Sequence, residues 1–112
     1  MSTDTDIVTY VEESEFDVVL NGSEEKVVVV DFTATWCGPC RLVSPLMEQL
    51  AQEYKGRAKV VKVDVDNNKP IFKKFGLRSI PAVLIFKDGI LAETIVGVSP
   101  YEDFSNAVQK LV

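Results

Sequence analysis

The stretch KVVVVDFTATWCGPC, residues 26–40, joins a run of apolar residues to the only two cysteines of the chain. The run 26–32 is rich in β-branched residues and is typical of a strand buried on both faces, as in the centre of a parallel sheet. Cys37 and Cys40 follow where an apolar periodicity typical of a helix begins. The stretch therefore predicts a strand that leads through a short turn into a helix, with both cysteines in the first helical turn.

The remaining chain predicts strands and helices in alternation. Strands are expected over residues 7–11, 58–66, 81–87 and 90–96, and helices over residues 13–21, 42–54, 69–75 and 99–111. Asp88-Gly89 between the last two strands is a strong hairpin signal. Ser99 and Glu102 form a capping-box pattern, with Pro100 at the first helical position. The order βαβαβαββα predicts an α/β fold, with a mixed five-stranded sheet and helices on both faces.

The composition favours a single folded domain over residues 1–112. Hydrophobic residues make up 46% and charged residues 26%, which is typical of a globular chain. The net charge is −5 and no long cluster of Lys or Arg is present, so nucleic acid and membranes are not expected as partners. Residues 1–6 look like neither a signal nor a transit peptide and are expected to form a flexible tail. We therefore expect a cytoplasmic, monomeric protein.

The cysteine pair allows three interpretations: a structural disulfide, half of a metal site, or a reversibly oxidised dithiol. A bridge that closes a loop of about four residues would constrain the unfolded chain by only roughly 2 kcal/mol. A structural zinc site needs four ligands, and the chain holds no histidine and no further cysteine. Both interpretations remain open, but each explains less of the stretch than the third.

A redox dithiol explains why the pair stands at a strand-to-helix junction. Unpaired backbone N–H groups and the positive end of the helix dipole stabilise a thiolate at a helix N-terminus. The thiolate is the nucleophile of thiol–disulfide exchange. Pro39 in the first turn removes no helical hydrogen bond and stiffens the pair, and Trp36 supplies an apolar contact beside it. We therefore favour a reversible dithiol.

These motifs resemble the thioredoxin family over nearly the whole chain. The resemblance rests on VVDFTATWCGPC, Pro45 in the following helix, Ile80-Pro81, Asp88-Gly89 and Gly97. It implies the thioredoxin fold and a protein-disulfide reductase whose Cys37–Cys40 dithiol reduces client proteins through a mixed disulfide. It also implies a role in electron transport and cell redox homeostasis. No bound cofactor is expected, because a thioredoxin reductase would supply the electrons.

The resemblance implies roles for four charged or sulfur-bearing residues. Cys37 attacks the client disulfide and Cys40 resolves the mixed disulfide. Asp31 assists Cys40, and Lys62 lies near Asp31. The residues alone leave Asp31 open between two readings: a strand-end carboxylate that reaches solvent or an ion pair, and a desolvated carboxyl that takes a proton from Cys40.

The resemblance also implies a docking surface for clients. Pro81 would follow a cis peptide bond and face the dithiol, leaving the backbone of Ile80 free to pair with an extended segment. The alternative for Gly97 and Val98 is that they form only a loop without a docking role. The expected apolar rim consists of Trp36, Gly38, Pro39, Ile80, Gly97 and Val98.

Three departures from the family pattern leave partner preference open: Thr33, Arg41 and Ala82.

A second class of function is a binding module, in which the rim holds a partner and the dithiol is incidental. Glutaredoxin-like glutathione chemistry is disfavoured by the CGPC sequence. Four further charged residues are expected to be solvated surface without a specific role: Asp64, Asp66, Lys73 and Lys74.

Overall fold

The computed structural model describes residues 7–112, so the predicted tail over residues 1–6 lies outside the described residues. The elements are β1 (Thr9–Tyr10), the 3-10 helix η2 (Glu13–Glu15), α1 (Phe16–Gly22), β2 (Val27–Thr33), α2 (Gly38–Glu53), β3 (Ala58–Asp64), α3 (Lys69–Lys74), β4 (Ala82–Lys87), β5 (Ile90–Val96) and α4 (Tyr101–Gln109). This order confirms the predicted alternation of strands and helices.

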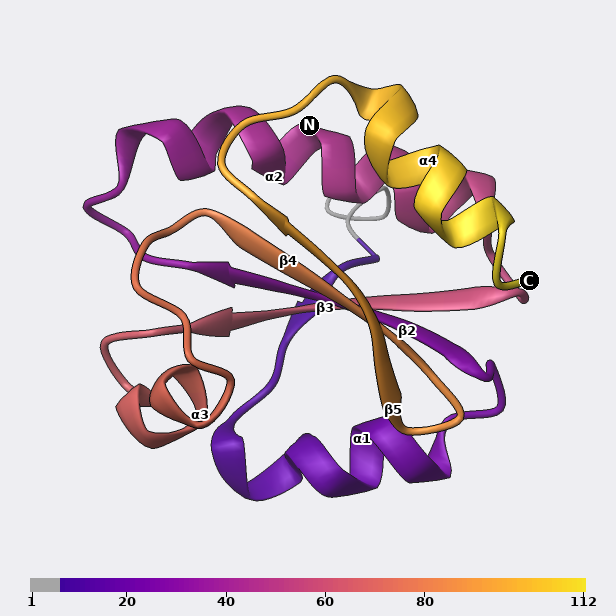
Figure 1. The fold of residues 1–112 in the computed structure, drawn as a ribbon, viewed down its shortest axis with the longest axis horizontal. Coiled ribbons are helices and arrows are strands. Elements are labelled where there is room, and N and C mark those ends of the chain that lie inside the picture. Colours follow the sequence, from indigo (N-terminus) through magenta and orange to yellow (C-terminus); the bar gives the residue numbers. More distant parts are fainter. Residues whose placement is uncertain (1–6) are drawn as a thin grey trace.

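The five strands form one mixed sheet in the order β1-β3-β2-β4-β5. β1, β3 and β2 run parallel, whereas β4 is antiparallel to both β2 and β5. Figure 1 shows α2 and α4 on one face of the sheet and α1 and α3 on the other. The mixed sheet with helices on both faces is therefore confirmed.

β2 lies at the centre because its side chains are apolar in both directions. Val28 and Val30 belong to the buried cluster under α1 and α3, and Val27 and Val29 to the cluster under α2 and α4. All four valines are at most 2% exposed. A strand with this pattern is stable only where both of its faces are covered, which fixes its position in the sheet.

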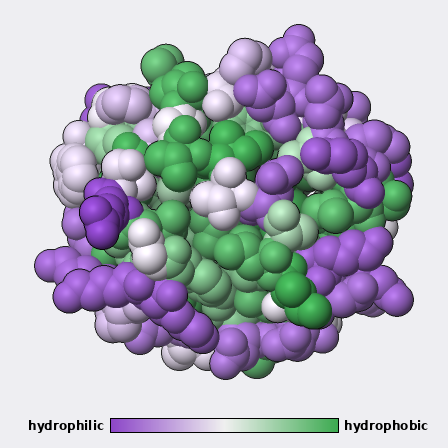
Figure 2. Space-filling view, in the orientation of Figure 1, coloured by the Kyte–Doolittle hydropathy of each residue, from purple (hydrophilic) through white to green (hydrophobic). Residues whose placement is uncertain are grey.

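β5 leaves one edge of the sheet without a partner strand. In Figure 2, hydrophobic side chains gather across the middle of the face on which β5 lies in front, and hydrophilic ones surround them. The exposed large apolar residues on and beside β5 are Ile90, Leu91, Val96 and Val98. The β4–β5 hairpin turns at Asp88 and Gly89, whose φ angles of 51° and 80° confirm the predicted turn.

The capping box predicted for the last helix is wrong. α4 begins at Tyr101, and Pro100 occupies the N-cap position without a side-chain hydrogen bond to the helix. Pro100 has φ −60° but ψ 152°, so its backbone is still extended. A proline φ fits both the N-cap and the first helical turn, and ψ, which the sequence does not fix, decides between them.

Most other boundaries differ by at most two residues from the prediction, but α2 begins four residues before the expected start at residue 42, and α1 begins three residues after residue 13, with η2 before it. The strand expected over residues 58–66 ends at Asp64, because the amide of Asp66 turns back to the Oδ1 atom of Asp64 at 2.9 Å. The strand expected over residues 7–11 is only β1, two residues long. No helix in residues 7–112 is both long enough and apolar enough to cross a membrane.

Candidate active site

A disulfide joins Cys37 and Cys40 at the start of α2, with their Cα atoms 5.3 Å apart. Cys37 is the N-cap residue, and its Sγ atom accepts a hydrogen bond from the backbone N–H of Cys40 at 3.2 Å. This contact places the sulfur of Cys37 at the positive end of the helix, as the sequence predicts. The two cysteines are 4% and 2% exposed in this oxidised form, so they differ little in burial.

The metal alternative finds no support in this part of the fold. In residues 7–112, no three His, Cys, Asp or Glu side chains are grouped in a way that could hold a metal ion. The first helical turn also contains no acidic residue that could complete a site with the two sulfurs. The two sulfurs are bonded to each other, which is the chemistry of a dithiol pair.

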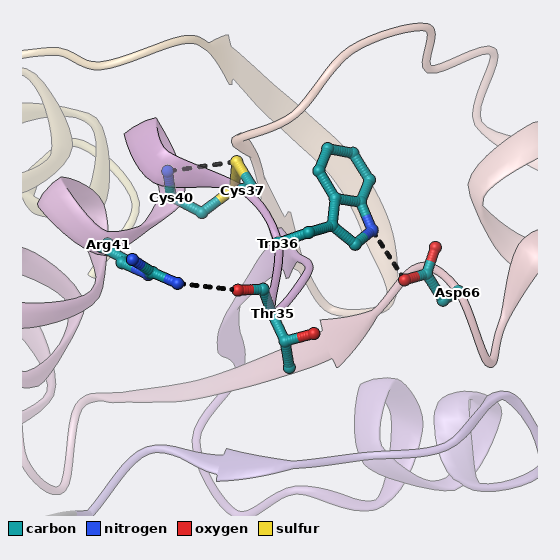
Figure 3. The surroundings of a disulfide bond; sticks show 6 residues. All are labelled: Thr35, Trp36, Cys37, Cys40, Arg41 and Asp66. Carbon is teal, nitrogen blue, oxygen red and sulfur yellow. Dashed lines mark hydrogen bonds between the residues drawn. A yellow bond between two sulfur atoms is a disulfide. The ribbon is translucent and has the colours of Figure 1, made fainter.

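Trp36 stands beside the disulfide with most of its ring in solvent, 65% exposed (Figure 3). Its Nε1 atom donates a hydrogen bond to Oδ2 of Asp66 at 2.7 Å. Asp66 is exposed, as expected of a surface residue, but this contact with Trp36 was not foreseen from the sequence. The two residues are 30 positions apart in sequence, but parallel pairing of β2 and β3 brings the ends of both strands to one edge of the sheet.

Arg41 extends back over the turn before the disulfide (Figure 3). Its Nη2 atom donates to the backbone carbonyl of Thr35 at 3.2 Å, which ties the first turn of α2 to the preceding loop. The residues between β2 and α2 are thus held from both sides, by Arg41 on the helix and by Asp66 beyond β3.

Asp31 lies in β2 with its carboxyl buried, 2% exposed. It alternates with Val30 and Phe32, so its side chain is directed to the face that α2 and α4 cover. Burial raises the pKa of Asp31 to about 7, while the positive charge of Lys62 acts in the opposite direction. Its Oδ1 atom has no hydrogen-bond partner. These features match the desolvated carboxyl rather than the exposed strand-end residue.

Lys62 is the register partner of Asp31 in the neighbouring strand β3. The two side chains nevertheless form no direct ion pair, since the only direct pair in the described chain joins Lys110 to Glu93. The ammonium of Lys62 instead lies over the ring of Tyr10, 4.6 Å from its centroid. The sequence placed Lys62 near Asp31 correctly but contained no signal for the contact with Tyr10.

Two residues of the expected docking rim lie together in one pocket. Trp36 and Ile80 line one pocket of about 340 Å³, whose full lining is Trp36, Val65, Phe72, Arg78, Ser79 and Ile80. Pro81 follows a cis peptide bond, and its carbonyl accepts a hydrogen bond from the N–H of Gly97 at 2.8 Å. Val98 is 49% exposed and is not part of the pocket lining. Gly38 and Pro39 are exposed on the turn itself.

The sequence missed four residues of this pocket. Val65 and Phe72 supply apolar walls, and Arg78 adds a positive charge next to Ser79. They come from the loop after β3, from α3 and from the loop before Ile80, so no local pattern connects them. The fold and the cysteine pair together define a class: α/β proteins with a redox-active disulfide at a helix N-terminus.

Comparison with known proteins agrees with this class. The thioredoxin family model matches residues 7–110. A thioredoxin of Staphylococcus saprophyticus is 40% identical over 103 residues, covering 92% of this chain and 96% of its own. Thioredoxin 1 of Synechococcus elongatus is 47% identical over 83 residues, covering 74% of this chain and 78% of its own. The chain therefore belongs to the thioredoxin family.

Solved structures extend the similarity to three dimensions. A mutant thioredoxin from Halobacterium salinarum superposes with a TM-score of 0.83 at 31% identity, covering 99% of this chain and 95% of its own. The relatives also include a chloroplastic M-type thioredoxin of Pisum sativum, 41% identical over 94% of this chain and 60% of its own. As a family member the protein is a thiol–disulfide oxidoreductase, whose partners are a reductase and disulfide-bearing proteins.

Proposed function

We propose that the protein reduces disulfides of client proteins, with Cys37 as the nucleophile and Cys40 as the resolving cysteine. The observation that carries this proposal is the position of Cys37 as the N-cap residue of α2, bonded to Cys40. In the reduced protein, the N–H groups of this helix end favour the thiolate of Cys37 over its thiol.

The reaction proceeds in two thiol–disulfide exchange steps. The thiolate of Cys37 attacks one sulfur of the client disulfide, forming a mixed disulfide and releasing the other client sulfur as a thiolate, which takes a proton from water. Cys40 then loses its proton and attacks the Sγ atom of Cys37. The second client thiolate leaves, the client gains two electrons, and the Cys37–Cys40 disulfide is formed.

Asp31 is proposed as the acceptor of the Cys40 proton, and Lys62 as the positive charge that limits the rise in the pKa of Asp31. A carboxyl whose pKa lies at about 7 can both take up and release a proton near neutral pH. The raised pKa has its main cause in burial, and the charge of Lys62 opposes it. Asp31→Asn should therefore slow the second step, in which Cys40 is deprotonated, more than the first.

The client would dock beside the disulfide, on the rim predicted from the sequence. The pocket lined by Trp36 and Ile80 offers apolar contact, and the exposed side chain of Val98 after Pro81 and Gly97 offers more. We further propose a monomer in the cytoplasm, with residues 1–112 as one domain. A thioredoxin reductase would restore the dithiol, and no nucleic acid or membrane would take part.

The test is the reduction of insulin by dithiothreitol, followed by turbidity. Cys37→Ser should lose all acceleration over dithiothreitol alone. Cys40→Ser should instead accumulate mixed disulfides with clients, because no second thiol resolves them. Val18→Ala is the matched control, since Val18 is 72% exposed on α1 and should leave the rate unchanged.

Three outcomes would count against the proposal. Acceleration that persists in Cys37→Ser would remove Cys37 as the nucleophile. Trapping of clients by Cys37→Ser, with none by Cys40→Ser, would reverse the two roles. Binding of clients without any acceleration in the wild type would favour the binding module.

A further inference from the structure

Three residues form a row across neighbouring strands of the sheet. Tyr10 of β1 is the register partner of Lys62 in β3, and Lys62 is the register partner of Asp31 in β2. Register partners in adjacent strands direct their side chains to the same face. The row therefore places an aromatic ring, an ammonium group and a carboxyl in sequence on the face under α2 and α4.

The ammonium in the middle of the row lies toward the ring and not toward the carboxyl. The Nζ atom of Lys62 is 4.6 Å from the centroid of Tyr10, within the distance of about 6 Å at which a cation–π attraction acts. Within residues 7–112, Asp31 has no direct ion pair, and its Oδ1 atom has no hydrogen-bond partner. The ring of Tyr10 is thus the neighbour that attracts the ammonium of Lys62 in this structure.

Among the described residues, the other elements packed around Asp31 contain no charged group that acts on its pKa. On β4 its register partner is Val83. On α2, Cys40 is held in the disulfide, and the carboxylate of Glu48 accepts the backbone N–H groups of Ile7 and Val8. Lys62 is the only charged group that displaces the pKa of Asp31.

The more distant elements on this face are paired with each other. Glu93 of β5 forms its ion pair with Lys110, just beyond α4, and the hydroxyl of Tyr101 donates a hydrogen bond to Glu53 of α2. The charge that acts on Asp31 therefore comes from Lys62, whose ammonium contacts the ring of Tyr10.

We propose that Tyr10 is a positioning residue for Asp31: its ring holds the ammonium of Lys62 on the edge-strand side of the sheet and so keeps the carboxyl unpaired. Without the ring, the ammonium is drawn toward the buried carboxylate. A closer positive charge favours the ionised form, so the proton affinity of Asp31 falls. The consequence for Cys40 rests on the proposed role of Asp31, but the positioning itself does not.

The test measures the titration of Asp31 in the oxidised protein by NMR of its 13C-labelled carboxyl group. Tyr10→Val keeps a β-branched residue in the strand but removes the ring, and Tyr10→Leu repeats the change with a longer side chain. Both should lower the apparent pKa of Asp31 by about one unit, the size expected when an ammonium moves several ångströms closer at an effective dielectric of about 20. Tyr10→Phe keeps the ring and should titrate as the wild type does.

A double-mutant cycle separates positioning from a general effect on the edge strand. In a Lys62→Met background, Tyr10→Val should leave the pKa of Asp31 unchanged, because the ammonium is absent. An unchanged or raised pKa in Tyr10→Val and Tyr10→Leu would overturn the proposal. So would a lowered pKa that Tyr10→Phe shares, or one that persists without Lys62. Because the oxidised protein carries out no reduction in this experiment, its outcome is independent of the proposed catalytic roles.

Discussion

The two faces of the sheet are buried to the same degree but by different chemistry. On the face under α1 and α3, Phe16, Phe75 and Phe86 form a ring cluster with centroid separations of 5.6–5.9 Å. The face under α2 and α4 contains mostly aliphatic residues, together with Tyr54, Phe104 and the buried carboxyl of Asp31. One central strand, β2, supplies residues to both.

This difference separates a cluster of rings that do not titrate from a face that contains a titrating carboxyl, while Cys37 and Cys40 pack in the same cluster as the rings. The aromatic cluster contains no titratable group, so its contribution to the free energy of unfolding should be the same at every pH at which the protein folds. The face with Asp31 holds a group whose folded pKa lies well above its ordinary value. Its contribution must change with pH, and it is this face on which the row of Tyr10, Lys62 and Asp31 lies.

The largest expected effect is that of Asp31→Asn. With a pKa of 3.8 in the unfolded chain and about 7 in the folded one, the folded state keeps its proton longer as pH rises. The stabilising contribution of the protonated Asp31 is therefore lost as pH rises from the lower of these values to the higher, and it is absent above both. At about 1.4 kcal/mol for each pH unit between them, the ionised carboxylate costs on the order of 4 kcal/mol. Asn cannot ionise and avoids this cost.

We expect Asp31→Asn to be more stable than the wild type by that amount at pH 8 and nearly equal at pH 3. Denaturant melts at the two pH values measure the difference. A variant that is less stable at pH 8, or whose advantage is the same at both pH values, would show that burial of this carboxyl does not burden the fold. Lys62→Met in the same experiment should increase the burden, because it removes the charge that opposes it.

The second effect tests the aromatic face. Phe86 is 2% exposed and contacts the rings of Phe16 at 5.9 Å and Phe75 at 5.6 Å. Phe86→Leu loses both ring contacts, each worth about 0.5–1.5 kcal/mol beyond the area it buries. We expect a loss of about 2 kcal/mol in the free energy of unfolding, equal at pH 5 and pH 8. A loss that depends on pH would contradict the division between the two faces.

How much of the fold and of the site could be predicted from the sequence depends on how far apart in the chain the interacting residues lie. The valine run before the cysteines fixed β2 as a central strand, and Asp88-Gly89 fixed the hairpin, since both are local patterns. The buried position of Asp31 did not follow from its place at the end of that run, because the residues alone left a solvent-reaching carboxylate equally open. Local sequence therefore predicted the fold and the position of the cysteine pair, but not the environment of Asp31.

Contacts between strands distant in sequence were not predictable in the same way. Tyr10 reaches Lys62 only because β1 pairs with β3 at the edge of the sheet, and a two-residue strand gives no sequence signal for its neighbour. The bond between Trp36 and Asp66 likewise depends on where β3 ends. In α4, the ψ angle of Pro100 decided the helix start against the predicted capping box.

The smallest effect sharpens the comparison within the face that carries Asp31. Tyr54 is 2% exposed at the end of α2, and its hydroxyl meets α4 through the carbonyl of Ser105 at 3.2 Å and Oε1 of Gln109 at 3.0 Å. Tyr54→Phe removes these neutral hydrogen bonds but keeps the ring over which Arg57 lies at 4.6 Å. Because the partners can reach water instead, we expect a loss of only about 0.5–1 kcal/mol.

This loss should be the same at pH 5 and pH 8, although Tyr54 lies on the face with the titrating carboxyl. Denaturant melts of Tyr54→Phe beside the wild type measure it, and Tyr54→Leu serves as the control that also removes the ring and should cost more. A pH-dependent loss in Tyr54→Phe would mean that the polar contacts between α2 and α4 respond to the charge on Asp31. A constant loss assigns the pH dependence of this face to Asp31 and to Lys62, whose charge acts on it.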